Sequence, residues 1–171
     1  KMVPNSTNDQ LETLWIRSYE GVASCNSVLR ALVTLQAGDG EKFGDQRAKE
    51  IEAEAKMLRA HYYFLLRRAF VKVPYIDEKA ATADAAVTPN DTDVYPQIQA
   101  DIEFAIANLP SGKTKGDVGR MNKAIAQAYL GKVLLYQNKQ PEALTLFQTV
   151  ISALPDLTAI PFENNFQTET E

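Results

Sequence analysis

The sequence predicts an all-α protein built from about five amphipathic helices. Apolar residues recur at helical spacing along most of the chain, no strand pattern of comparable strength appears, and the last helices repeat a pattern found earlier in the chain. With 171 residues, 45% of them hydrophobic, the chain is long enough to bury the core of one globular domain. We therefore expect a single helical domain over residues 1–171.

The first helix is predicted from Asp9 to about Gln36. Its apolar residues recur at helical spacing, and the polar run at 6–9 supplies capping oxygens ahead of them. The run Gly38-Asp39-Gly40 is expected to end the helix, because glycine adopts the left-handed cap conformation without a Cβ penalty. The expected apolar stripe consists of Leu11, Trp15, Val22, Leu29 and Val33.

The second helix is predicted over about 46–70, and a long connection follows it over 71–92. Two prolines, Pro74 and Pro89, and weak periodicity indicate that this connection is not helical. Loops of this length are uncommon unless they have a function. The expected apolar stripe of the helix consists of Ile51, Ala55, Leu58, Tyr62, Leu65 and Leu66.

Three shorter helices complete the prediction, over about 93–109, 121–138 and 141–154. Pro110 and Gly112 end the first of them, and Pro141 suits the first turn of the last. The expected inward residues of the first are Ile98, Ile102, Ala105 and Leu109.

The last two helices have the residue spacing of tetratricopeptide repeats, in which small residues allow helices to cross closely and larger ones fill the gap. An offset of 45 positions relates Ile98, Ile102, Ala105 and Pro110 to Ala143, Phe147, Val150 and Pro155. A larger offset of 71 positions relates Arg59-Ala60 and Tyr63 to Leu130-Gly131 and Leu134. The difference of 26 residues corresponds to an insertion in the proline-bearing connection. We therefore expect helix pairs at about 46–109, with an inserted loop at 71–92, and at 119–154, stacked as a right-handed α-α superhelix.

Composition excludes several function classes. With 18 basic and 22 acidic residues the chain has a net charge of −4, so we expect no nucleic-acid partner. The one histidine, His61, lies beside aromatic residues without a positioned nucleophile, and Cys25 has no partner for a disulfide or a metal cluster. We expect no catalytic residue, no metal site and no cofactor.

Several charged residues fall near predicted helix contacts. We interpret Glu54, Arg59, Asp101 and Arg120 as members of interhelical ion pairs, which fix helix register, rather than as ligand-binding groups. Glu52 and Lys56 are spaced for an ion pair within one helix.

The candidate ligand-binding residue is Trp15. Trp15 and Tyr19 lie one turn apart on the first helix and can offer stacking faces to sugar rings. The alternative is that the two rings pack in the core, with Asn26 on the same side satisfying a buried backbone group.

Residues 52–64 resemble the helix signature of the SusD/RagB-like family of nutrient-binding lipoproteins, and Val73-Pro74 follows as in that family. Family members often have an aromatic-glycine pair before the Val-Pro, and this chain departs from that pattern at Phe70-Val71. The other resembling residues, in the family's order, are Trp15, Tyr19, Asn26, Val28 and Leu29; Val94-Tyr95, Ile98, Asp101-Ile102, Ala105 and Leu109-Pro110; and Gly119-Arg120, Ala124, Leu130, Leu135-Tyr136 and Glu142-Ala143.

The resemblance implies a surface-exposed, lipid-anchored protein of the outer membrane. Such proteins capture glycans or other nutrients without catalysis and act with a SusC-like, TonB-dependent outer-membrane transporter, on which the helical core docks. The signal peptide, the lipidated cysteine and the large C-terminal region of the family have no counterpart in these 171 residues, so we expect the chain to be a fragment of a larger SusD-like fold.

Two alternatives stay open at this point. A cytoplasmic tetratricopeptide adaptor would bind peptides or protein partners in a concave groove. A helical glycan-processing enzyme would need two carboxylates that face each other across a pocket.

Overall fold

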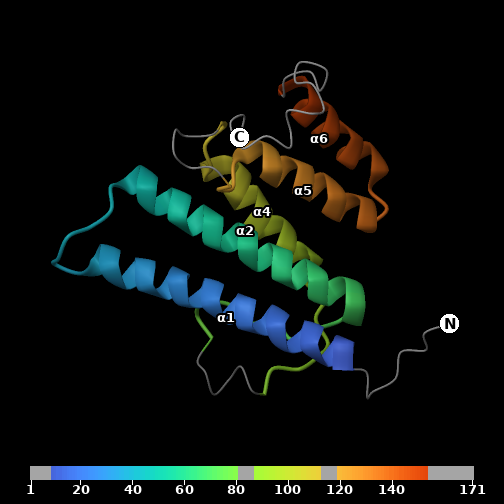
Figure 1. Ribbon diagram of the computed structural model, residues 1–171, viewed down its shortest axis with the longest axis horizontal. Helices are drawn as coiled ribbons and strands as arrows, with labels where there is room; N and C mark the ends of the chain where they lie inside the picture. The colour runs from blue at the N-terminus through green and yellow to red at the C-terminus, as the bar shows by residue number, and fades with distance from the viewer. Residues whose placement is uncertain (1–8, 81–86, 113–118, 154–171) are drawn as a thin grey trace, which may run out of the picture.

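The computed structural model describes residues 9–80, 87–112 and 119–153, which form helices without any strand in those ranges. The helices are α1 (Asp9–Ala37), α2 (Asp45–Phe70), α4 (Tyr95–Asn108), α5 (Lys123–Tyr136) and α6 (Gln140–Ala153). They stack in chain order, with α1 at one edge and α6 at the other (Figure 1). The predicted all-α, tetratricopeptide-like class is confirmed. No helix in the described part combines the length and apolarity needed to cross a bilayer.

Helix α1 follows the prediction except at its C-terminal end. Val33 is 68% exposed, and Leu32 is buried in its place. Residues three and four positions after Leu29 both lie near one face of a helix, and packing against α2 selects the first of them. The helix ends at Ala37, but neither Gly38 nor Gly40 has the left-handed conformation that we expected. The predicted capping oxygens at 6–8 lie outside the described residues.

Helix α2 occupies the centre of the stack, because it packs against α1 on one side and α4 on another. Its buried residues therefore cover a wider part of the helix surface than the predicted stripe. Leu58, which belongs to the predicted stripe, is instead 39% exposed. Part of the stripe instead lines a shallow hollow of about 320 Å³ between α1 and α2. The innermost residues, each at most 1% exposed, are Ala53, Met57, Ala60, Tyr63, Phe64 and Leu66.

The two predicted helix pairs pack as helix pairs, α2 with α4 and α5 with α6. A Cβ atom at Gly131 would lie 2.7 Å from the Phe147 ring, so glycine permits the close crossing of α5 and α6. The equivalent positions Ile98 and Ala143 are both buried. Pro155, the last residue of the predicted repeat, lies outside the described residues.

The turn after α2 is the point where the chain departs from the family pattern. Val71 has φ 68° and ψ −63°, and the Lys72 N–H donates to the Phe70 carbonyl oxygen at 2.8 Å. These values define a γ-turn with a positive φ, which is strained for a β-branched residue. The turn sends the chain back along the stack, where Val73 is fully buried.

Candidate functional site

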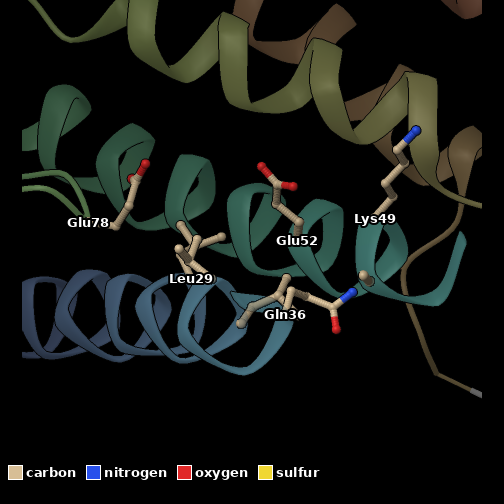
Figure 2. A pocket seen from close by; sticks show the side chains of 8 residues that line it. Leu29, Gln36, Lys49, Glu52 and Glu78 are labelled. Carbon is tan, nitrogen blue, oxygen red and sulfur yellow. The ribbon is translucent and has the colours of Figure 1, made fainter. Parts of the chain in front are cut away.

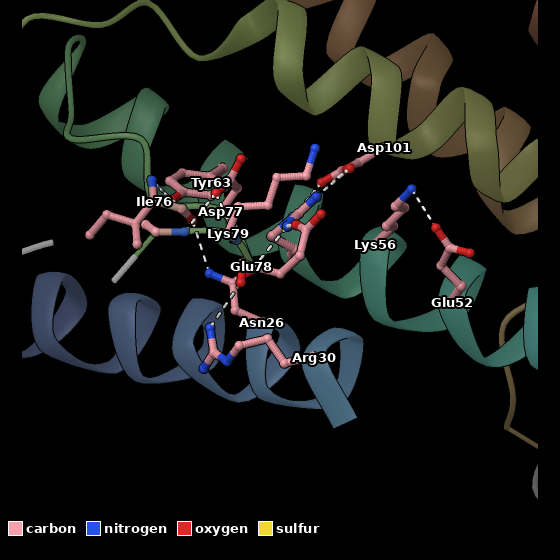
Figure 3. A network of polar contacts seen from close by, with 12 residues as sticks. Asn26, Arg30, Glu52, Lys56, Tyr63, Ile76, Asp77, Glu78, Lys79 and Asp101 are labelled. Carbon is pink, nitrogen blue, oxygen red and sulfur yellow. Dashed lines mark hydrogen bonds and ion pairs between the residues drawn. The ribbon is translucent and has the colours of Figure 1, made fainter. Parts of the chain in front are cut away.

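The connection that leaves α2 is held against α1 and α2 by polar side chains. The Tyr19 hydroxyl donates to the Pro74 carbonyl oxygen at 2.7 Å, and Asn26 Nδ2 donates to the Ile76 carbonyl oxygen at 2.9 Å. The Tyr63 hydroxyl accepts from the Ile76 N–H at 2.7 Å and donates to the Ile76 carbonyl oxygen at 2.9 Å (Figure 3). The alternative reading of Asn26, as the partner of a buried backbone group, is thereby confirmed.

Arg59 lies at the centre of this network and is only 3% exposed. Its Nε and Nη2 donate to the two carboxylate oxygens of Asp101 at 2.7 and 2.8 Å. Its Nη1 donates to Asn26 Oδ1 at 2.9 Å and to Glu78 Oε2 at 2.5 Å. One guanidinium thus joins α1, α2, α4 and the connection, because only arginine offers a planar fork of five donors. The predicted ion pair is confirmed, and Glu78 is a member that sequence reasoning missed.

The charges in the network depend on Arg59. Burial raises the pKa of Asp101, although the hydrogen bonds from the guanidinium act in the opposite direction. Burial also opposes ionisation of Glu78, but the hydrogen bond and charge of Arg59, a backbone hydrogen bond and the charge of Lys56 together outweigh it and lower the pKa of that carboxyl. Both carboxylates are therefore committed to the same cation, which suits a fixed scaffold rather than proton transfer.

A second ion pair joins α2 to the segment before α5. Arg120 Nε and Nη2 donate to the Glu54 carboxylate at 2.9 and 2.6 Å. Lys56 pairs with Glu52 at 2.7 Å within α2. These contacts confirm that Glu54 and Arg120 form an ion pair and that Glu52 pairs with Lys56.

Trp15 is half-buried and packs between the start of α1 and the end of α2. Its ring centroid lies 4.9 Å from that of Tyr19 and 4.9 Å from that of Phe70, the latter in an edge-to-face arrangement. The ring therefore packs against other aromatic residues. Its role in ligand binding stays a prediction.

His61 forms a side-chain hydrogen bond with Tyr129. Its Nδ1 lies 2.9 Å from the Tyr129 hydroxyl oxygen. Burial and the positive charge of Lys132 lower the pKa of the imidazole. Among the described residues, no group of three or more His, Cys, Asp or Glu is placed to hold a metal ion.

A small pocket lies between α1 and α2 beside the network (Figure 2). Its volume is about 190 Å³, with Leu29 and Leu32 in its apolar lining. Its polar lining includes Glu52 and Glu78, which are paired with Lys56 and Arg59 respectively. The volume is below that of most ligand sites.

A larger hollow of about 510 Å³ lies at the C-terminal end of α2. Side chains from α1, α2, α4 and α5 contribute to it, so residues far apart in sequence meet there, and no short motif identifies it. Its volume is within the range of small-molecule sites. The lining residues are Leu14, Leu65, Arg67, Arg68, Ala69, Tyr95 and Tyr136.

Comparison with known proteins gives a consistent result. SusD-like protein P2 of Formosa agariphila is 30% identical to this chain over 165 residues, which are 93% of this chain and 31% of that protein. The chain spans only 23% and 31% of the length of the two curated relatives that it matches first.

Solved structures agree with this result. A laminarin-binding SusD-like protein is 32% identical, with a TM-score of 0.67 over 81% of this chain and 29% of that chain. Surface glycan-binding protein A of Bacteroides thetaiotaomicron, solved in complex with laminarihexaose, is 26% identical, with a TM-score of 0.68 over 92% of this chain and 32% of that chain.

The family model that matches covers residues 2–135, most of the chain, and is described as starch-binding and associating with the outer membrane. The described helices agree with that match, because several of the residues that resemble the family, among them Asn26, Leu29, Ile98, Ile102 and Leu130, are buried between the helices. The chain belongs to the SusD-like family.

Proposed function

We propose that this chain is the helical part of a surface-exposed, lipid-anchored protein that binds glycans or other nutrients without catalysis. The bound nutrient would enter the cell through a SusC-like, TonB-dependent outer-membrane transporter. The observation that carries the proposal is the fixed path of residues 74–78 on the buried Arg59 network. A connection fixed before binding loses less conformational entropy when a ligand binds, as a recognition surface requires.

The class of ligand is argued from the relatives. One solved relative binds laminarin, and another was solved with laminarihexaose, so a neutral oligosaccharide is the first ligand to test. The described part of the chain supports this class with tyrosine rings and paired carboxylates, which stack on sugars and accept hydrogen bonds from their hydroxyl groups.

The electrostatics favour binding over hydrolysis. A glycosidase needs one carboxyl group with a raised pKa as general acid and a second carboxylate opposite it. Glu78 and Glu52 line one pocket, but the pKa of Glu78 is lowered and each carboxylate already pairs with a cation. Family membership likewise favours a surface binding protein over a cytoplasmic adaptor.

The experiment is a binding titration of the complete protein with laminarihexaose and with oligosaccharides of other linkages, followed by chromatography of each mixture. We expect saturable binding of at least one oligosaccharide and its full recovery intact. Shortened products would contradict the proposal in favour of an enzyme. Binding of peptides with no oligosaccharide binding would favour the adaptor.

For docking on the transporter we propose the exposed face of α6. Leu144 and Ile151, two turns apart on this helix, are 57% and 72% exposed, while Ala143 and Val150 are buried. Two large apolar side chains on one helix face suit a protein interface. A Leu144→Ser/Ile151→Ser variant is expected to lose co-purification with the transporter and to keep oligosaccharide binding. The control is Val28→Ser/Leu35→Ser, the equivalent exposed pair on α1; equal losses in both variants would argue against α6.

A further inference from the structure

The hollow at the end of α2 combines aromatic rings with positive charge. Tyr136 is 49% exposed, and its ring meets that of Phe64 edge-to-face, with centroids 5.1 Å apart. The Arg68 guanidinium lies over both rings, 5.0 Å from the Tyr136 centroid and 5.6 Å from that of Phe64. The rings thus hold the guanidinium at the edge of the hollow.

The two arginines of the hollow differ in their partners. Arg67 donates to Asp93 at 2.9 Å and lies over the Tyr95 ring, so its charge is balanced within the fold. Arg68 is exposed and forms no ion pair with any residue in the described ranges. Basic residues in the last turn stabilise a helix through its dipole, which accounts for the charge of Arg68 but not for its aromatic surroundings.

A second cation lies beside Arg68. Lys132 Nζ is 6.0 Å from the Phe64 centroid and 5.8 Å from that of Tyr129, and it too lacks an ion pair among the described residues. Lys132 and Tyr136 are one turn apart on α5, so they share a face. Two cations that form no ion pair within the described ranges thus flank one buried ring in a chain whose net charge is −4.

We propose that this hollow, with Arg68 in its lining and Lys132 one turn before Tyr136 on α5, binds an acidic sugar unit, one that bears a carboxylate or a sulfate. Arg68 pairs with the anionic group in the bidentate geometry that guanidinium favours, and the exposed Tyr136 ring packs against the sugar face. The concave shape and the volume of about 510 Å³ fit one or two sugar units better than a flat protein surface. This inference rests on the proposed function and adds a preference for acidic over neutral glycans.

The test uses the complete protein and two ligands that differ in one respect: a β-linked glucose oligomer and the same oligomer oxidised to glucuronate at C6. Titration at low and high salt is expected to show tighter binding of the oxidised oligomer, by about tenfold at low salt, since charge-assisted hydrogen bonds are stronger than those between neutral groups. The preference should shrink as salt screens the charges.

The variant Arg68→Gln is expected to abolish the preference, because it weakens binding of the oxidised oligomer more than binding of the neutral one. Arg17→Gln is the matched control, because Arg17 is an exposed arginine of α1 that pairs with Glu20. A preference that survives Arg68→Gln, or that falls equally in Arg17→Gln, would overturn the assignment. Thermal unfolding of both variants shows whether each one is folded.

The remaining outcomes separate this inference from the proposed function. Binding of the neutral oligomer without any preference for the acidic one would overturn only the acidic-sugar site. Failure to bind any oligosaccharide would overturn both. Arg68-dependent binding of polyglutamate, without binding of the oxidised oligomer, would overturn the site in favour of an acidic protein partner.

Discussion

The Arg59 guanidinium spans the Asp101 carboxylate with hydrogen bonds of 2.7 and 2.8 Å in the interior of the stack. Removal of one member of a buried ion pair costs about 3–5 kcal/mol, and the lower end of that range applies here because Arg59 keeps Glu78 as a second carboxylate partner. We expect Asp101→Asn to lower the free energy of unfolding by about 3 kcal/mol in urea denaturation.

Two controls test this explanation. Glu20→Gln removes a partner of the exposed Arg17–Glu20 pair and is expected to cost less than about 1 kcal/mol. Arg59→Met/Asp101→Leu removes both buried charges and is expected to be more stable than Asp101→Asn. Equal effects of Asp101→Asn and Glu20→Gln would mean that the buried pair contributes no more than a surface one.

The γ-turn at Val71 predicts a stabilising substitution. Its positive φ costs on the order of 1–3 kcal/mol, whereas glycine adopts this conformation freely at an entropic cost of about 0.5–1 kcal/mol. Val71 is 56% exposed, so little packing is lost. We expect Val71→Gly to raise stability by about 1 kcal/mol in thermal unfolding. Lys72→Gly, the adjacent control, should destabilise, and a loss of stability in both variants would contradict the assignment of strain.

The close crossing of α5 and α6 predicts the opposite response at Gly131. Alanine favours a helix over glycine by about 1 kcal/mol, yet its Cβ would meet the Phe147 ring at 2.7 Å. We expect Gly131→Ala to destabilise by about 1 kcal/mol or more in urea denaturation. Phe147→Leu in the same chain should reduce that cost, and Gly40→Ala, where a Cβ meets no atom within 4 Å, should be neutral. A neutral Gly131→Ala would show that the crossing adjusts easily.

The sequence predicted the helices and their pairing better than their buried faces. Spacing identified α1, α2 and α4 because each has apolar residues at a 3.6-residue period, and it identified α5 and α6 through the residue spacing of the repeat. It placed Leu58 in the core because periodicity treats a helix as having one buried side, whereas α2 packs against two neighbours; it placed Val33 there because local spacing does not decide between Leu32 and Val33. Burial on two sides depends on tertiary arrangement, which local spacing does not encode.

Prediction of the candidate site was similarly partial. Arg59, Asp101, Glu54 and Arg120 were identified as ion-pair members, since charges at predicted helix contacts need partners. Glu78 was missed because it lies in the connection, where no periodicity applies. The hollow lined by Arg68 and Tyr136 was also missed, because these residues come from different helices and meet only after folding.

His61 predicts a pH dependence of stability. Burial and Lys132 lower its pKa in the folded chain below the usual 6.5, so the folded state binds this proton less readily than the unfolded state. Its contribution is therefore fully present above pH 6.5 and is lost as the pH falls through 6.5 toward the folded pKa. Urea denaturation across this range should show a steeper loss for the wild type than for His61→Gln. Identical slopes would show that His61 titrates alike in both states.

Trp15 is the one residue that we predicted from the sequence to bind ligand. Its packing against Tyr19 and Phe70 allows substitutions that separate a role in packing from a role in binding. Trp15→Ala removes the ring, whereas Trp15→Phe keeps an aromatic face against Tyr19 and Phe70. Aromatic contacts contribute about 0.5–1.5 kcal/mol, so loss of a stacked sugar should weaken binding of laminarihexaose by up to about tenfold in Trp15→Ala and less in Trp15→Phe. Phe70→Leu loosens the packing of Trp15 without removing its ring and should leave the affinity nearly unchanged. If Trp15→Ala folds normally and binds with unchanged affinity, Trp15 is a packing residue and the glycan contacts lie elsewhere on the protein.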